Sequence, residues 1–160
     1  LADSVTGAGD ATTFNSTEGV LYAEIAKRQE DNDNFILISL NNAASNSDAN
    51  SVAIGFNNGT EFFIRIKANG GLVFLDSSTT ANKNQFYKVA LRYKSGDISA
   101  FIDGVNVASS TTAFSFGAIL DNLSLDYNGN GTFPFFGKIK SVITFNTALT
   151  DAELQCLTTI

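Results

Sequence analysis

The sequence predicts an all-β fold, an antiparallel sandwich of two sheets with one short C-terminal helix. Apolar and polar residues alternate with a period of two in most of the apolar runs, as in strands with one face in a core and one in water. Turn signals rich in Gly and Asn separate these runs about every ten residues, which is typical of sandwiches and barrels. The chain has a single proline, Pro134, so little interrupts the expected strand ladders.

The expected strands follow one another along most of the chain. In 61–67, for example, Phe62 and Ile64 face the core, while Phe63 and Arg65 fall on the opposite face. The same alternation, or a short continuous apolar run, marks the other strands. The expected strands span 18–28, 34–40, 51–56, 61–67, 85–94, 97–102 and 105–109.

A tight hairpin is expected at Asp103-Gly104. This pair favours the positive φ of a type I′ turn, and it joins the strand 97–102 to the strand 105–109. Ile98, Ala100 and Ile102 then face the core, and Phe101 lies on the opposite face.

The one expected helix lies within 147–157. Thr150 is its predicted N-cap, and Glu153 follows three residues later to complete a capping box. Leu149, Leu154 and Leu157 are then placed to pack onto a sheet. The lone cysteine, Cys156, cannot form an internal disulfide, and we expect it to be a small buried side chain.

The length and the net charge of the chain exclude several classes of function. The chain has 160 residues, which fits a single domain spanning 1–160, and its net charge is −6. An acidic domain without a basic cluster predicts no nucleic-acid partner and no anionic membrane surface, and no apolar run is long enough to insert into a bilayer. The chain starts abruptly at "LADSVTGAGD", and we expect it to be the C-terminal module of a longer protein.

Histidine is absent, which excludes a Ser-His-Asp triad and any metal site with imidazole ligands. Glycoside hydrolysis needs two carboxylates facing one cleft. Glu24 and Glu61 lie on strand segments, but nothing in the sequence places them together.

Three segments resemble the concanavalin A-like lectin/glucanase superfamily, in its LamG-like branch. "FYKVALRYKSGDISAFIDGVNVAS" (86–109) is similar to its strand-turn-strand core, and "FFGKIKSVITFNTALTDAEL" (135–154) is similar to its C-terminal ending. "FNSTEGVLYAEIA" (14–26) resembles the first long strand of members found in bacteriophage tail and adsorption proteins. The resemblance implies a jelly roll with one concave sheet, a carbohydrate-binding role, and a place in the virion tail or adsorption apparatus or at a cell surface.

The resemblance implies a binding module and no enzyme. Glucanases of the superfamily carry Glu-x-Asp-x-x-Glu on one strand, whereas "EIAKRQE" (24–30) lacks the middle aspartate. Lectins of the superfamily often bind calcium, but their ligand positions do not match residue by residue here. No cofactor is therefore required, and calcium stays open, with Asp31 and Asp33 as the first candidate ligands and Asp126 next. The alternative is that these residues form polar turns.

Aromatic and arginine side chains on the strand faces opposite the core suit a glycan, because a sugar ring has an apolar C–H face and a rim of hydroxyls. We therefore predict a non-catalytic module that binds a glycan or cell-surface polysaccharide as its partner. One alternative is a structural or oligomerising decoration domain, in which these aromatics lie at a protein interface or a homo-oligomer contact; another is a polysaccharide hydrolase or lyase. The loop aromatics Phe133 and Phe136 are further candidates. The predicted ligand-binding residues are Tyr22, Phe63, Arg65, Arg92, Phe101 and Tyr127.

Overall fold

The computed structural model describes residues 9–28, 35–42, 48–127 and 133–160. Within them the chain forms two antiparallel sheets of five strands each and one short helix. The elements are β1 (Glu18–Ala26), β2 (Ile36–Asn41), β3 (Ser51–Phe56), β4 (Phe62–Ala68), β5 (Gly71–Asp76), β6 (Tyr87–Lys94), β7 (Ile98–Ile102), β8 (Val105–Ser110), β9 (Asn122–Ser124), β10 (Lys138–Phe145) and α1 (Asp151–Thr158).

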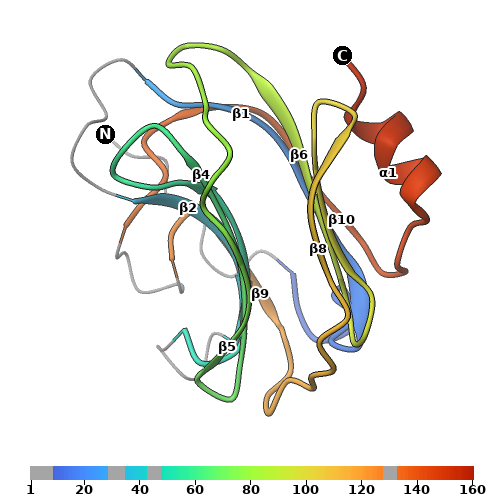
Figure 1. The fold of residues 1–160 in the computed structure, drawn as a ribbon. Coiled ribbons are helices and arrows are strands. Elements are labelled where there is room, and N and C mark those ends of the chain that lie inside the picture. Colours follow the sequence, from blue (N-terminus) through green and yellow to red (C-terminus); the bar gives the residue numbers. More distant parts are fainter. Residues whose placement is uncertain (1–8, 29–34, 43–47, 128–132) are drawn as a thin grey trace.

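The two sheets stack face to face, which confirms the predicted jelly-roll sandwich. One sheet has the strand order β5-β4-β3-β2-β9 and the other the order β10-β1-β6-β7-β8. Figure 1 shows that both sheets bend in the same direction, so that the first sheet is concave on its outer side and the second is convex on its outer side, toward α1. We call the first the concave sheet and the second the helix-side sheet.

The main core lies between the sheets and uses the residues that alternation predicted. Ile64 and Ile66 of β4 meet Leu21 and Leu91 of the helix-side sheet in one buried cluster, and all four are fully buried. Burial of this apolar surface is the main force that holds the two sheets together.

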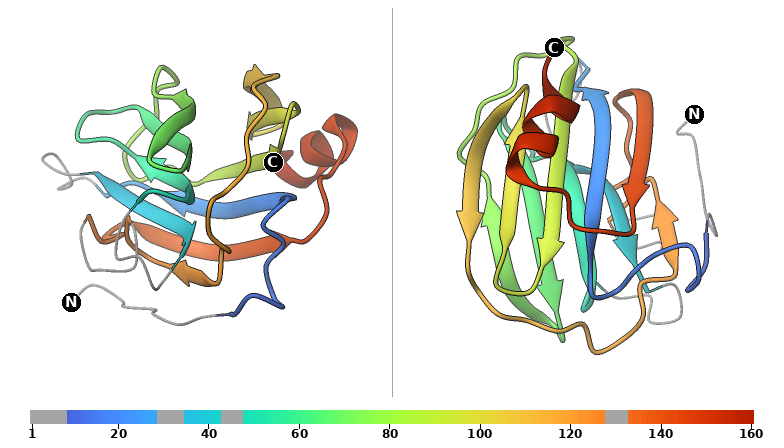
Figure 2. Two further views of the ribbon diagram at one scale, coloured as in Figure 1. Left: turned by 90° about the horizontal axis from the view of Figure 1, so that it is seen from below. Right: turned by 90° about the vertical axis from the view of Figure 1, so that its right-hand side faces the viewer.

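A second, smaller core lies on the other face of the helix-side sheet, beneath α1. Leu154 of the helix packs there with Leu149 and Leu157 partly buried beside it, as predicted. Figure 2 shows α1 lying across the strands of this sheet. Cys156 is exposed, contrary to expectation, because the helix buries the face that carries Leu154 and Thr158.

The capping box and the tight hairpin both form as predicted. The Thr150 hydroxyl accepts from the Glu153 main-chain N–H, and the Glu153 carboxylate accepts from the Thr150 N–H. Asp103 and Gly104 have φ values of 48° and 79°, as in a type I′ turn. The Gly104 N–H then donates to Thr158 Oγ1 at 3.1 Å, so the hairpin holds the C-terminal end of α1.

The alternation did not predict three strands: β5 and β9 complete the concave sheet, and β10 pairs with β1 at the edge of the helix-side sheet. β5 follows an Asn69-Gly70 turn with φ values of 53° and 79°, but its Leu72 and Leu75 are exposed and hide the alternation. β9 is only three residues long. Within the described residues no helix is long and apolar enough to cross a membrane.

Candidate functional site

Alternation along β4 places long polar and aromatic side chains on the outer face of the concave sheet. Ile64 and Ile66 point into the core, so Phe63, Arg65 and Lys67 point outward. In the register of the sheet, Arg65 lies opposite Ala53 and Phe63 lies opposite Gly55. These small neighbours leave space above β3, which the longer side chains of β4 can cover.

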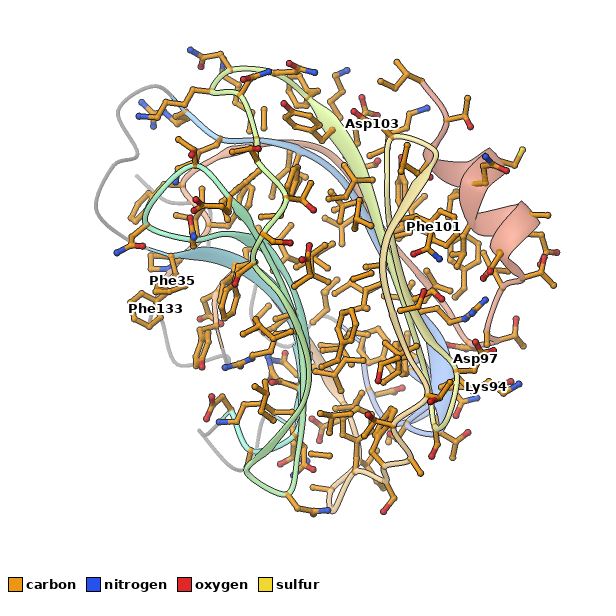
Figure 3. The ribbon with its side chains drawn as sticks, in the orientation of Figure 1. Phe35, Lys94, Asp97, Phe101, Asp103 and Phe133 are labelled. Carbon is orange, nitrogen blue, oxygen red and sulfur yellow. The ribbon has the colours of Figure 1, made fainter. Side chains whose placement is uncertain are left out.

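Four aromatic rings and one arginine gather there, and we call them the aromatic–arginine cluster. Phe35 packs edge-on against Phe63 at 4.9 Å between ring centroids and against Phe133 at 5.6 Å, and Phe133 meets Tyr127 at 5.5 Å. The guanidinium carbon of Arg65 lies 4.4 Å from the Tyr127 ring centroid and 5.7 Å from that of Phe63. Figure 3 shows Phe35 and Phe133 side by side on the outer side of the concave sheet.

Phe133 holds an unusual backbone conformation at this site. Its φ is +49°, in the left-handed region that non-glycine residues seldom adopt, and its side chain is 38% exposed. The N–H of Leu37 donates to its carbonyl at 3.4 Å. Such conformations cost about 1–3 kcal/mol and gather at ligand-binding and active sites. Here the strain presents a large aromatic ring to solvent beside other rings.

One carboxylate organises the polar side of the cluster. Asp48 Oδ2 accepts from Lys67 Nζ at 2.8 Å, from the Tyr127 hydroxyl at 2.6 Å and from Arg65 Nη1 at 3.2 Å. Arg65 Nη1 also donates to the Tyr127 hydroxyl oxygen. The group therefore holds two cations and one anion and carries an excess positive charge in a chain whose net charge is −6.

The pKa values of these groups follow from their contacts. Burial alone disfavours the charged form of Asp48, but the hydrogen bonds from Lys67 and Tyr127 and the charges of Arg65 and Lys67 outweigh it and lower its pKa. Burial raises the pKa of Tyr127, and its hydrogen bond to Asp48 raises it further. At neutral pH Asp48 is therefore ionised and Tyr127 keeps its proton.

Arg65 is buried, with 5% of its surface exposed, yet one of its donors has no partner. Its Nη2 donates to Ser51 Oγ at 3.3 Å, whereas its Nε has no hydrogen-bond acceptor in the part of the chain that the structure describes. A buried donor without an acceptor is rare in proteins, so this group marks a place where an acceptor is missing.

The floor beside the cluster is a buried polar network across β2 and β9. Asn41 Nδ2 donates to Ser39 Oγ and to Ser124 Oγ, both at 2.8 Å, and Asn122 Nδ2 donates to Asn41 Oδ1 at 3.0 Å. Ser39 Oγ also donates to the Asp126 carbonyl at 2.8 Å. Such satisfied networks are rigid, so β9 and the approach to Tyr127 are fixed against β2.

The structure divides the six predicted ligand-binding residues between two surfaces. Phe63, Arg65 and Tyr127 come together in the cluster, whereas Tyr22, Arg92 and Phe101 lie on the outer face of the helix-side sheet. Figure 3 places Phe101 between this sheet and α1, far from Phe35 and Phe133.

The expected exposure of Tyr22, Arg92 and Phe101 is wrong, and Arg65 is likewise buried although it lies in the cluster. Tyr22 and Phe101 are buried in the small core that Leu154 of α1 completes. Arg92 is also buried: its Nη1 donates to Asp151 Oδ1 at 2.8 Å and to the Leu149 carbonyl at 2.9 Å, and its Nη2 pairs with Asp97. These contacts give Arg92 a structural role, since it links the β6–β7 turn to the start of α1.

Phe35, Asp48 and Lys67 belong to the site but were not predicted. Lys67 lies on the same strand face as Arg65, so the alternation alone could have identified it. Phe35 directly precedes β2 and follows its alternation. Asp48 lies in a polar loop, and nothing in its local sequence distinguishes it from other turn aspartates.

Neither the predicted calcium ligands nor the two strand carboxylates considered for hydrolysis form a site in the described residues. Asp31 and Asp33 lie outside the described residues, and Asp126 is buried beside the polar floor. In the described segments no group of three or more acidic or cysteine side chains is placed to hold a metal ion, and calcium stays a prediction. Glu24 pairs with Lys140 on the helix-side sheet, whereas Glu61 accepts from Asn57 at the start of β4, so they form no pair.

The model of the concanavalin A-like lectin/glucanases superfamily matches residues 10–155. Among solved structures, the CBM40 of a Ruminococcus gnavus IT-sialidase, bound to α2,3-sialyllactose, superposes with a TM-score of 0.74 at 19% identity; the match covers 100% of this chain and 96% of that one. A search of curated protein sequences finds no match.

Two further solved structures are similar to this chain. Domain 4 of AbnA, a GH43 extracellular arabinanase from Geobacillus stearothermophilus in complex with arabinotriose, gives a TM-score of 0.62 at 16% identity, over 94% of this chain and 70% of that one. The leech intramolecular trans-sialidase gives 0.67 at 21% identity, over 91% of this chain but 24% of that one. At these identities the likeness concerns the fold.

Proposed function

This chain belongs to the concanavalin A-like lectin/glucanase superfamily, and we propose that it is a non-catalytic carbohydrate-binding module that holds a surface glycan in its aromatic–arginine cluster. The observation that carries the proposal is that an exposed ring, Phe133, and the buried guanidinium of Arg65 both contact Tyr127 on the concave face of one sheet. A sugar needs an aromatic surface for its C–H face and fixed charged donors and acceptors for its hydroxyls.

The cluster supplies both kinds of contact. Phe133 and Phe63 offer ring surface, and Lys67 and Asp48 lie at the partly exposed polar side with defined hydrogen-bond geometry. Because Arg65 and Asp48 are held by partners within the protein, little side-chain order is lost when a ligand binds. The Nε donor of Arg65, which has no acceptor among the described residues, supports the same conclusion, since a ligand oxygen could supply the missing acceptor.

In the described part of the site, glycoside hydrolysis lacks its main requirement, which is two carboxyl groups facing one cleft. Asp48 is the carboxylate that the described residues place against the cluster, and it is engaged by two cations and a tyrosine. General acid catalysis needs a carboxyl with a raised pKa, whereas the pKa of Asp48 is lowered. Binding without turnover is therefore the function that the site supports best.

The relatives that were solved with sugars support this proposal at the level of the fold. One is a CBM40 bound to sialyllactose, and another is an arabinanase domain in complex with arabinotriose. From these relatives we transfer only the ligand class, a saccharide, to this chain. We also expect the chain to lie outside the cell or at a cell surface. The placement in a phage tail or adsorption protein stays a prediction from the resemblance of residues 14–26.

A glycan array followed by calorimetric titration tests the proposal. We expect binding to at least one glycan, and we expect Phe133→Ala to weaken it about fivefold to tenfold by removing a stacking surface. Phe136→Ala is the matched control, because Phe136 is similarly exposed at 43% but has no ring contact with the cluster within the described residues. Its affinity should match that of the wild type.

Two results would contradict the proposal. If no glycan binds and the protein forms a tight oligomer in solution that Phe133→Ala dissociates, the cluster is a protein interface, as in the structural alternative. If a polysaccharide is cleaved, the module is an enzyme.

A further inference from the structure

A second hollow of ≈ 340 Å³ opens at one end of the sandwich, away from the aromatic–arginine cluster. Its walls are residues 114–119 of the segment between β8 and β9, together with Ser95 of the β6–β7 turn and Ser16 and Thr17 before β1. Figure 2 shows this segment crossing the end of both sheets. The two sites share no residue.

The walls of this end pocket are tied in place by hydrogen bonds from both sheets. The Gly117 N–H donates to Asn50 Oδ1 at 2.9 Å, and Asn69 Nδ2 donates to the Ser115 carbonyl at 3.0 Å. On the other side, the Phe114 N–H donates to Ser95 Oγ at 2.9 Å. A pocket with fixed walls binds without a large ordering cost.

The apolar part of the end pocket is aromatic. Phe114 and Phe116 lie edge to face at 5.2 Å between ring centroids, and both are half-buried. Ile119 adds apolar surface that is 56% exposed. Among the described residues, no Asp, Glu, Lys or Arg lines the hollow, so none of them would neutralise a charged ligand there.

The polar part of the end pocket is a set of hydroxyls with unused capacity. Ser16 Oγ and Ser95 Oγ each accept a main-chain N–H at 2.9 Å, yet their own hydroxyl protons donate to no acceptor in the described part of the chain. Thr17 Oγ1 donates to Asn15 Oδ1 at 2.7 Å and keeps lone pairs to accept with. The site therefore offers two hydroxyl donors and one acceptor beside two rings.

We propose that the end pocket binds one uncharged saccharide ring. The rings of Phe114 and Phe116 contact its C–H face, the Ser16 and Ser95 hydroxyls donate to its oxygens, and Thr17 accepts from one of its hydroxyls. The volume lies at the low end of the range for small-molecule sites, roughly 300–1,000 Å³, which suits a single sugar unit. An apolar side chain of a partner protein would suit this pocket less well, because it would form no hydrogen bonds with the hydroxyls of Ser16, Ser95 and Thr17. The inference goes beyond the proposed function, because neither site needs the other.

The test is a titration of the ¹⁵N-labelled protein with neutral methyl glycosides of glucose, galactose and mannose, with glucuronate as a charged ring and cyclohexanol as an apolar ring. We expect a saturable shift of the Ser95, Phe116 and Gly117 amides with at least one neutral glycoside, and none with glucuronate. Phe116→Leu should weaken this binding at least about fivefold while keeping apolar volume, whereas Phe133→Leu should leave it unchanged. Thr17→Val, which keeps the side-chain shape but removes the acceptor together with its hydrogen bond to Asn15 Oδ1, is the second variant if Phe116→Leu does not fold, and it should weaken the same binding.

Amides at residues 63–65 report on the concave sheet separately, so failure of the end pocket is distinguishable from failure of the aromatic–arginine cluster. The inference is overturned if no neutral glycoside shifts the end-pocket amides, or if only cyclohexanol does so, which would make the hollow a site for apolar groups.

Discussion

Arg65 stacks its guanidinium on the ring of Tyr127, with 4.4 Å between the guanidinium carbon and the ring centroid, and the two side chains share Asp48 as an acceptor. The arginine comes from the middle of β4 and the tyrosine from the loop after β9, and β3 and β2 lie between these two strands in the concave sheet. Their contact therefore reaches over two strands and fixes one wall of the aromatic–arginine cluster.

Arg65→Lys should weaken glycan binding more than it weakens folding. Lysine keeps the charge but loses the planar fork that stacks on Tyr127 while contacting Asp48 and Ser51. We expect the dissociation constant to rise about tenfold, which corresponds to about 1.4 kcal/mol. Calorimetric titration with the glycan found on the array measures it. An unchanged dissociation constant would remove Arg65 from the binding site.

The Asp48 carboxylate should make stability depend on acid pH. Its folded-state pKa is lowered, so its contribution is present above the ordinary aspartate pKa of about 3.9 and is lost as the pH falls through the folded value. Asp48→Asn should therefore melt at a lower temperature than the wild type at pH 7, and the difference should shrink on acidification. Thermal melts from pH 7 to pH 2 check this, and a difference that stays constant would contradict it.

Arg92→Met should destabilise the protein without altering glycan binding. The buried guanidinium links Asp97 and Asp151, which are 52% and 63% exposed as side chains and so remain hydrated when it is lost. Because water screens these two exposed carboxylates, we expect the free energy of unfolding to fall by only about 2 kcal/mol. Urea denaturation gives the stability and titration gives the affinity. Loss of affinity in a folded Arg92→Met protein would return Arg92 to the binding site.

The hairpin at Asp103-Gly104 should be more sensitive to substitution than the similar hairpin at Asn69-Gly70. Both glycines have a φ of 79°, so an alanine at either position costs about 1–2 kcal/mol of left-handed strain. At Gly104 the new Cβ would also lie 3.1 Å from Thr159 Oγ1, whereas at Gly70 it meets nothing within 4 Å. Gly104→Ala should thus cost more in urea denaturation, and equal costs would show that the hairpin does not hold the end of α1.

The alternation of side chains predicted the fold because burial on one face is a local property of each strand. It assigned Ile98, Ala100 and Ile102 to the core and Phe101 to the opposite face, and all four lie there. β5 was not predicted because Leu72 and Leu75 are apolar although they are exposed on this edge strand, so apolar and polar residues do not alternate along it.

The site was predicted only in part, for a physical reason. Alternation places Phe63 and Phe101 alike on the face opposite the core, but it does not say which of those faces is covered. The covering helix was predicted from the capping box at Thr150, yet its docking depends on Leu154 meeting Phe101 and on the Gly104 N–H reaching Thr158, which are contacts between distant segments. Phe133 and Asp48 reach the site from loops in the same way.

The map of backbone amide shifts on adding the tightest-binding glycan tests the central claim most directly. Our account predicts that the largest shifts fall on residues 37–39, 53–55 and 63–65 of the concave sheet, and that Phe133→Ala reduces them at equal glycan concentration. Largest shifts at residues 90–92 and 99–101, beneath α1, would contradict it.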